Sequence, residues 1–132
     1  MLFRSEIDIG VNLMWKSLPL VTHLAGPARA KQLVAGGVRT HAETLFDWGI
    51  LDQLVPRAEL LSAAQTIAEF YAGKPPIAAQ MIKRSVNAIV SMSDQSIMHM
   101  DVDQNILSAT TDDRDVAIAA YLDKTEPTFT GN

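Results

Sequence analysis

Residues 26–37 read GPARAKQLVAGG, and this short stretch carries both a start signal and a stop signal for a helix. Pro27 stands where a helix opens, because its missing N–H is not needed there and its fixed φ already suits helical backbone. Gly36 and Gly37 follow the segment, and glycine is the residue that most often ends a helix. The spacing therefore predicts a helix over 28–35 with both ends defined.

Similar start and stop signals for helices occur on either side of this helix. Upstream, SLPLVTHL over 17–24 predicts a short helix that tolerates Pro19 in its first turn. Downstream, Thr40 and Glu43 have the spacing of a capping box, and the helix that they begin ends at Gly49. Apolar residues at helical spacing, with Ser, Thr, Asp or Pro at the starts, predict four more helices over 58–72, 77–91, 93–107 and 111–124.

Two segments alternate apolar and polar residues instead. Residues 2–10, LFRSEIDIG, alternate loosely before a turn at Gly10, and residues 50–56, ILDQLVP, end at Pro56. We expect a short strand in each. The predicted fold class is mainly α with two short strands.

Composition excludes several classes of protein. The chain has 132 residues, which is enough for one domain at most. Of these residues 48% are hydrophobic and 20% are charged, which indicates a globular protein and not a disordered one. Eleven basic residues stand against 15 acidic ones without a basic run, which argues against nucleic-acid binding. There is no cysteine, hence no disulfide or thiolate chemistry. No apolar run approaches the ~20 residues of a membrane helix and no signal-peptide pattern occurs, so we expect no membrane association and a cytoplasmic location.

Glu6 is the first candidate for chemistry. It precedes a glycine-containing turn and stands beside Ile7, and a carboxylate held by rigid backbone among apolar neighbours is typical of acid/base residues. An exposed strand carboxylate with no role is the alternative.

The remaining candidates each have a simpler interpretation. His99, Asp101 and Asp103 could hold a metal, but two ligands on one helix favour a solvated face, and we expect no metal site. His23 and His41 are isolated, and the Gly36–Gly37 pair lacks the GxGxxG context of a dinucleotide loop. Charges at Lys83, Arg84 and Lys124 could contact an anionic cofactor or only solvate a helix. Tyr121, one turn before Lys124, adds an aromatic face on the same side.

Five stretches, taken in order, resemble the C-terminal half of the enoyl-CoA hydratase/isomerase family, the crotonase superfamily. They are FRSEIDIG (3–10), AGPARAKQLVAGG (25–37), THAETLFDWGILDQLVP (40–56), KPPIAAQMIKRSVNAI (74–89) and TTDDRDVAIAAYLDKTEPTFTG (110–131). The resemblance runs from Phe3 onward and implies the helical C-terminal portion of a crotonase-like α/β fold. Within one domain over 1–132, residues 1–56 would hold the end of the core and the first helices, and residues 57–132 the C-terminal helical part.

The resemblance also implies site residues. Glu6 matches the carboxylate of the family's P-E motif, a general acid/base in hydratases, although Ser5 replaces the proline. Tyr121 and Lys124 match residues near the adenine end of CoA. The implied substrate is a CoA thioester, with no bound prosthetic group. Both oxyanion-hole donors and a second glutamate of the family would lie upstream and are absent here. Where the family has a glycine-rich turn this chain has VNLMWKS, so Met14 and Trp15 are expected to fill space that glycines leave open.

Three interpretations remain open at this point. The chain could be part of an enzyme for hydration or double-bond isomerisation of acyl-CoA, incomplete alone, whose partner is a missing N-terminal half or other copies in a trimer or hexamer. It could instead be a non-catalytic helical oligomerisation or interaction module. It could also be a truncated product without a function of its own.

Overall fold

The computed structural model describes residues 6–15, 17–98 and 100–132, and the regular structure in these ranges is helical. The elements are η1 (Ile7–Ile9), α1 (Leu18–Ala25), α2 (Pro27–Val34), α3 (Ala42–Asp47), η2 (Arg57–Glu59), α4 (Leu60–Ala72), α5 (Pro76–Val90), α6 (Gln95–Met98), α7 (Met100–Ala109) and α8 (Asp112–Asp123), where η marks a 3-10 helix.

The helix boundaries predicted from proline and glycine are confirmed at α2. Pro27 is its first residue, the Gly36 N–H donates to the Lys31 carbonyl at 3.0 Å, and Gly37 has a φ of +59°. Pro19 and Pro76 likewise lie in the first turns of α1 and α5. Chain stiffness at proline and freedom at glycine therefore set these helix boundaries locally.

Both predicted strands are wrong over the described residues. Residues 7–9 form η1 and Gly10 ends it in the left-handed conformation, while residues 50–56 are irregular. Within the described ranges, no residue of either segment pairs with another strand, so the backbone hydrogen bonds of a sheet are not made there. Residues 2–5 of the first predicted strand lie outside the described residues.

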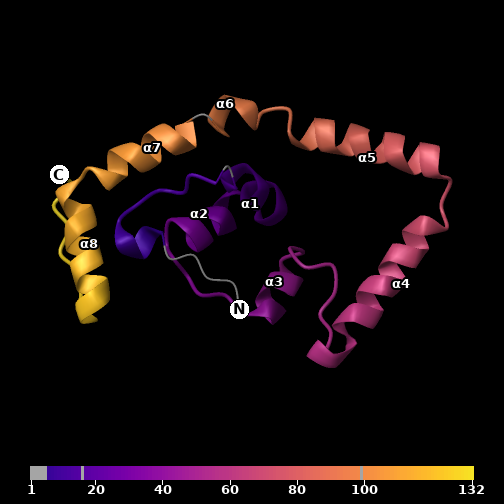
Figure 1. Cartoon of the computed structure of the whole chain (residues 1–132), viewed down its shortest axis with the longest axis horizontal. Coiled ribbons are helices and arrows are strands. Elements are labelled where there is room, and N and C mark those ends of the chain that lie inside the picture. The colour runs from indigo at the N-terminus through magenta and orange to yellow at the C-terminus, as the bar shows by residue number, and fades with distance from the viewer. Residues whose placement is uncertain (1–5, 16, 99) are drawn as a thin grey trace.

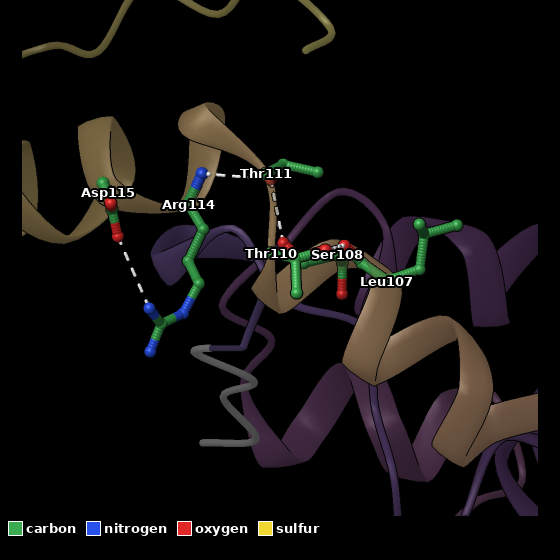
Figure 2. A network of polar contacts seen from close by, with 6 residues as sticks. All are labelled: Leu107, Ser108, Thr110, Thr111, Arg114 and Asp115. Carbon is green, nitrogen blue, oxygen red and sulfur yellow. Dashed lines mark hydrogen bonds and ion pairs between the residues drawn. The ribbon is translucent and has the colours of Figure 1, made fainter.

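One helix start also differs from prediction. Thr40 donates its hydroxyl to the Val38 carbonyl at 3.3 Å, and His41 is the N-cap of α3 without a side-chain bond, so the capping box does not form. The described helices α6 and α7 lie within the helix expected over 93–107, and residue 99 between them is outside the described part. At α8 the prediction holds, because Thr111 caps the helix by accepting from the Arg114 N–H at 3.3 Å (Figure 2).

The helices form a curved arm around an inner group. In Figure 1, α1, α2 and α3 lie inside, and α4 to α7 follow each other around them. At the far end of the arm, α8 packs against η1, and α1 packs against α2 in the inner group. The arm thus brings the C-terminal helix back to the segment around Glu6.

The buried core is small. Among the described residues it comprises Leu13, Ala25, Ala30, Leu33, Leu45, Ala117 and Ala120, and neither α4 nor α5 contributes a buried residue. The solvent-accessible surface is 9905 Å², against roughly 6,800 Å² expected for a compact protein of this mass. Apolar side chains on α4 and α5, among them Leu61, Phe70, Ile77 and Ile82, are consequently exposed. None of the described helices combines the length and the hydropathy that crossing a membrane requires.

Candidate active site

The backbone around Glu6 is held in a tight turn. The Glu6 carbonyl accepts hydrogen bonds from the Ile9 N–H at 3.3 Å and the Val11 N–H at 3.0 Å. Gly10 closes the turn with a φ of +70°. The half-buried Glu6 side chain therefore projects from a segment whose own hydrogen bonds define its shape.

This turn is seated directly on α8 at Gly10. A Cβ added there would lie 2.8 Å from the Arg114 Cα and 3.2 Å from the Ala117 Cβ. Ala117 is only 1% exposed, so this close contact also excludes water. Because the φ is positive and the neighbour is backbone, only glycine fits, and the position of Glu6 depends on this contact.

Glu6 lines a cleft of about 700 Å³ between η1, α1, α2, α7 and the C-terminal tail. Most of its walls are apolar, and the charged residues among the described lining are Glu6, Lys31 and Asp113. The others are Ile7, Gly10, Val11, Asn12, Leu13, Leu18, Thr22, Pro27, Ala30, Val34, Ala35, Ser108, Thr111 and Phe129. A carboxylate in a largely apolar cleft can exchange protons with a bound organic molecule.

Asn12 ties the loop after Glu6 to α7. Its backbone N–H donates to the Ser108 Oγ at 3.0 Å and its Nδ2 to the Gln104 Oε1 at 2.8 Å, while its carbonyl accepts from the Asn105 Nδ2. Asn12 could not be predicted as a site residue from the sequence, because its partners lie more than 90 positions away and no local pattern indicates them.

Met14 and Trp15 do not line the cleft. Both are exposed, and the Trp15 indole Nε1 donates to the Glu6 Oε1 at 3.2 Å. The expectation that these two side chains fill the space of a glycine-rich turn is therefore not met at this cleft. Trp15 instead contacts the candidate carboxylate.

The C-terminal tail is held against the start of α8 by Asp113. Its carboxylate accepts from the backbone N–H groups of Thr130 and Gly131, both at 2.8 Å, and from the Thr130 hydroxyl at 3.3 Å. The bonds from these two N–H groups lower the pKa of Asp113 below its usual value, because they stabilise the charged form. This anchorage brings the neighbouring Phe129 into the cleft wall.

Tyr121 lines a second, smaller cleft of about 310 Å³, which shares Ile7 and Phe129 with the first. The fold therefore brings Tyr121 close to the other side of the segment that carries Glu6. Lys124 is exposed at the end of α8 with a φ of +56° and lines neither cleft.

The other candidates lie apart from the cleft. The His23 Nε2 lies 2.6 Å from the Oδ1 of buried Asp94, and this pair joins α1 to the start of α6. Asp101 is 1% exposed and its Oδ2 has no hydrogen-bond partner within the described ranges. Exposed positions are occupied by His41, Lys83, Arg84 and Asp103.

Metal-ligating side chains do not gather in the described part of the chain. No group of three or more His, Asp or Glu side chains capable of holding an ion comes together there. His99, the imidazole of the metal hypothesis, lies outside the described residues. The Gly36–Gly37 pair belongs to the end of α2, as its hydrogen bonds show.

Known proteins resemble this chain in sequence over most of its length. The family model for enoyl-CoA hydratase/isomerase matches residues 3–132. A 1,2-epoxyphenylacetyl-CoA isomerase of Escherichia coli (strain K12) is 30% identical over 112 residues, covering 85% of this chain and 43% of that protein. A crotonyl-CoA hydratase of Syntrophomonas wolfei is 25% identical over 126 residues, covering 96% of this chain and 48% of that protein. The chain thus spans about half the length of these curated relatives.

Solved structures agree on the fold. An enoyl-CoA hydratase from Mycobacterium avium subsp. paratuberculosis K-10 superposes with a TM-score of 0.83 at 20% identity, covering 97% of this chain and 52% of that one. An enoyl-CoA hydratase/isomerase from Pseudoalteromonas atlantica T6c gives 0.81 at 20% identity, with 95% and 50% covered. The helical arrangement is therefore that of a crotonase-like fold. Together with the family match over nearly its whole length, this shows that the chain belongs to the enoyl-CoA hydratase/isomerase family.

Proposed function

We propose that this chain supplies the general acid/base carboxylate, Glu6, for hydration or double-bond isomerisation of an acyl-CoA thioester. The observation that carries the proposal is the placement of Glu6 in an apolar cleft, on a turn held by Gly10. One of the two relatives is named as an isomerase and the other as a hydratase, and each name specifies an acyl-CoA thioester.

The chemistry follows from the carboxylate and its surroundings. In hydration, Glu6 would take a proton from the water that attacks the β-carbon and a proton would be returned to the α-carbon. In isomerisation, Glu6 would take a proton from the α-carbon and return it to the γ-carbon, so that the double bond moves by one position. Such a positioned group contributes about 10²–10⁴-fold to rate. The apolar walls formed by Leu13, Leu18 and Val34 would exclude bulk water from the reacting carbons.

The negative charge that develops on the thioester oxygen must also be stabilised, because both reactions pass through an enolate-like oxyanion. Removing one preorganised donor typically costs about 10²–10³-fold, and the family resemblance implies that both donors lie in a segment that precedes Phe3. We therefore propose that this chain acts together with that further segment, in one polypeptide or as a separate chain. The exposed apolar side chains of α4 and α5 support this, since such surfaces are normally covered.

Tyr121 and Lys124 are proposed to contact the adenine end of CoA. Tyr121 presents an exposed ring beside η1, and Lys124 adds a cation three positions later. A ring of this kind can stack on a base while the cation meets a phosphate. No prosthetic group is part of the proposal.

The test is calorimetric titration of the folded chain with crotonyl-CoA, alone and together with a polypeptide that supplies the preceding segment, followed by a hydration assay of the assembly. We expect saturable binding in the assembly, and a loss of about 100-fold or more in kcat for Glu6→Gln, since it keeps the shape of the side chain but cannot transfer the proton.

Glu43→Gln provides the control, because Glu43 is an exposed carboxylate on α3 outside the cleft. Unchanged turnover in Glu6→Gln would remove Glu6 from the mechanism. Absence of crotonyl-CoA binding in both settings would contradict the substrate class.

A further inference from the structure

The hydrogen bond between Trp15 and Glu6 has a property that a contact with another acid or base would lack. The indole Nε1 carries a hydrogen-bond donor and no acceptor, and it titrates nowhere in the physiological range. It lies 3.2 Å from the Glu6 Oε1. The indole can therefore hold one carboxyl oxygen without exchanging a proton with it.

Both partners of this bond stand on anchored backbone. The turn that carries Glu6 is closed by its own hydrogen bonds and seated on α8 through Gly10. Three residues before Trp15, Asn12 is fixed to α7 by its N–H, its side-chain amide and its carbonyl. A tryptophan has only two side-chain torsions, so little further ordering is required to hold the indole in place.

The two side chains meet the cleft differently. Glu6 is part of the cleft wall, whereas Trp15, which is 66% exposed, is not. The indole thus reaches the carboxylate without occupying the space in which a substrate would lie. The indole bonds Oε1, and Oε2 lies outside this bond.

We infer that Trp15 is a positioning residue for Glu6: its indole N–H fixes the carboxylate so that Oε2 takes and returns the proton. This inference rests on the proposed function of Glu6. Displacing a reacting group by about 1 Å can cost on the order of 10²-fold in rate, so such a constraint matters to the reaction more than to the stability of an exposed pair.

The decisive measurement is the ¹⁵N-indole resonance of Trp15, followed from pH 3 to pH 8 in the full chain. Trp48→Phe assigns the two indole signals, because Trp15 and Trp48 are the two tryptophans of the sequence. We expect the Trp15 resonance to follow a single titration that disappears in Glu6→Gln. The Trp48 resonance, whose ring lies 5.0 Å from the Arg29 guanidinium carbon, should not follow it.

A second readout tests orientation instead of contact. With ¹³C-labelled glutamate, the Glu6 carboxyl resonance should shift in Trp15→Phe, which keeps a ring and removes the donor. Trp48→Phe should leave the Glu6 signal in place.

Either of two results would overturn the inference. One is a Trp15 resonance that stays constant across the titration of Glu6, and the other is a Glu6 carboxyl resonance that is the same in wild type and in Trp15→Phe. Neither readout requires turnover. A chain that shows the titration but binds no crotonyl-CoA would refute the proposed substrate and leave the Trp15–Glu6 contact established, so the two failures are distinguishable.

Discussion

At the scale of single residues, the candidate site depends on a glycine more directly than on any charged group. Gly10 combines a positive φ with backbone of Arg114 2.8 Å from where a Cβ would stand. From the sequence it is visible only as a turn residue. Its contact with α8 spans most of the chain, and therefore could not be predicted from local pattern.

We expect Gly10→Ala to lower the free energy of unfolding more than a left-handed conformation alone explains. The conformation costs roughly 1–2 kcal/mol for an L-residue, and displacement of η1 from α8 adds to it. Gly49→Ala is the matched control, because Gly49 has a φ of +75° and nothing within 4 Å of its added Cβ. Urea denaturation of both variants measures the difference, and equal losses would show that the close approach contributes nothing.

Asp113 makes the anchorage of the tail depend on pH. Its pKa in the folded protein is lowered by the N–H groups of Thr130 and Gly131, so its contribution is present above its usual pKa of about 4. The contribution is lost as the pH falls from there through the lower folded value. We expect the amides of Thr130 and Gly131 to lose hydrogen-exchange protection over this range.

Asp113→Asn should show the same loss of protection at neutral pH, since the charge that attracts the two N–H groups is gone. Asp115→Asn serves as control, because Asp115 is exposed on the same helix and pairs with Arg114 at 3.4 Å (Figure 2). Equal protection in Asp113→Asn and wild type would contradict the role of the charge.

At the scale of elements, the helices were predictable where proline or glycine marks their ends. Residues 28–35, 58–72 and 77–91 were predicted close to α2, α4 and α5. The predicted strand over 2–10 failed because alternation in so short a segment does not distinguish a strand from a turn that packs on a distant helix. Some residues join distant elements, such as Asn12 and Asp94. The sequence next to such residues does not indicate the contacts that they make.

The junction between α7 and the loop after Glu6 offers a test at this scale. Ser108 accepts from the Asn12 N–H and donates to the Asn105 carbonyl at 2.9 Å. Ser108→Ala leaves that N–H without its partner, so we expect a loss of about 1–2 kcal/mol in unfolding free energy. Ser62→Ala on α4 removes only an exposed local bond to the Glu59 carbonyl and should cost less than about 0.5 kcal/mol. Similar losses in the two variants would contradict the importance of this junction.

At the scale of the whole molecule, the curved arm leaves more surface than a compact chain would have. The helical fold class was predictable from composition and periodicity, but the open arrangement of α4 and α5 was not, because amphipathic spacing predicts an apolar face without saying what covers it. Their apolar residues are exposed.

Small-angle scattering should register this shape. A compact chain of 132 residues has a radius of gyration of about 14 Å, and we expect a clearly larger value for this chain at low concentration. Light scattering on the same sample gives the mass and separates an open monomer from an oligomer. A monomer with a radius of about 14 Å would contradict the open arrangement.

The bond between Asn12 and Ser108 joins residues 96 positions apart. Ribosomes make a chain from the N-terminal side to the C-terminal side, so the segment that carries Glu6 is made long before α7 and α8 exist to receive it. Contacts of such long separation are closed slowly, since the intervening chain must first be confined. We expect the segment around Glu6 to become ordered only after α7 and α8 have been made, which leaves it exposed to chaperones until then.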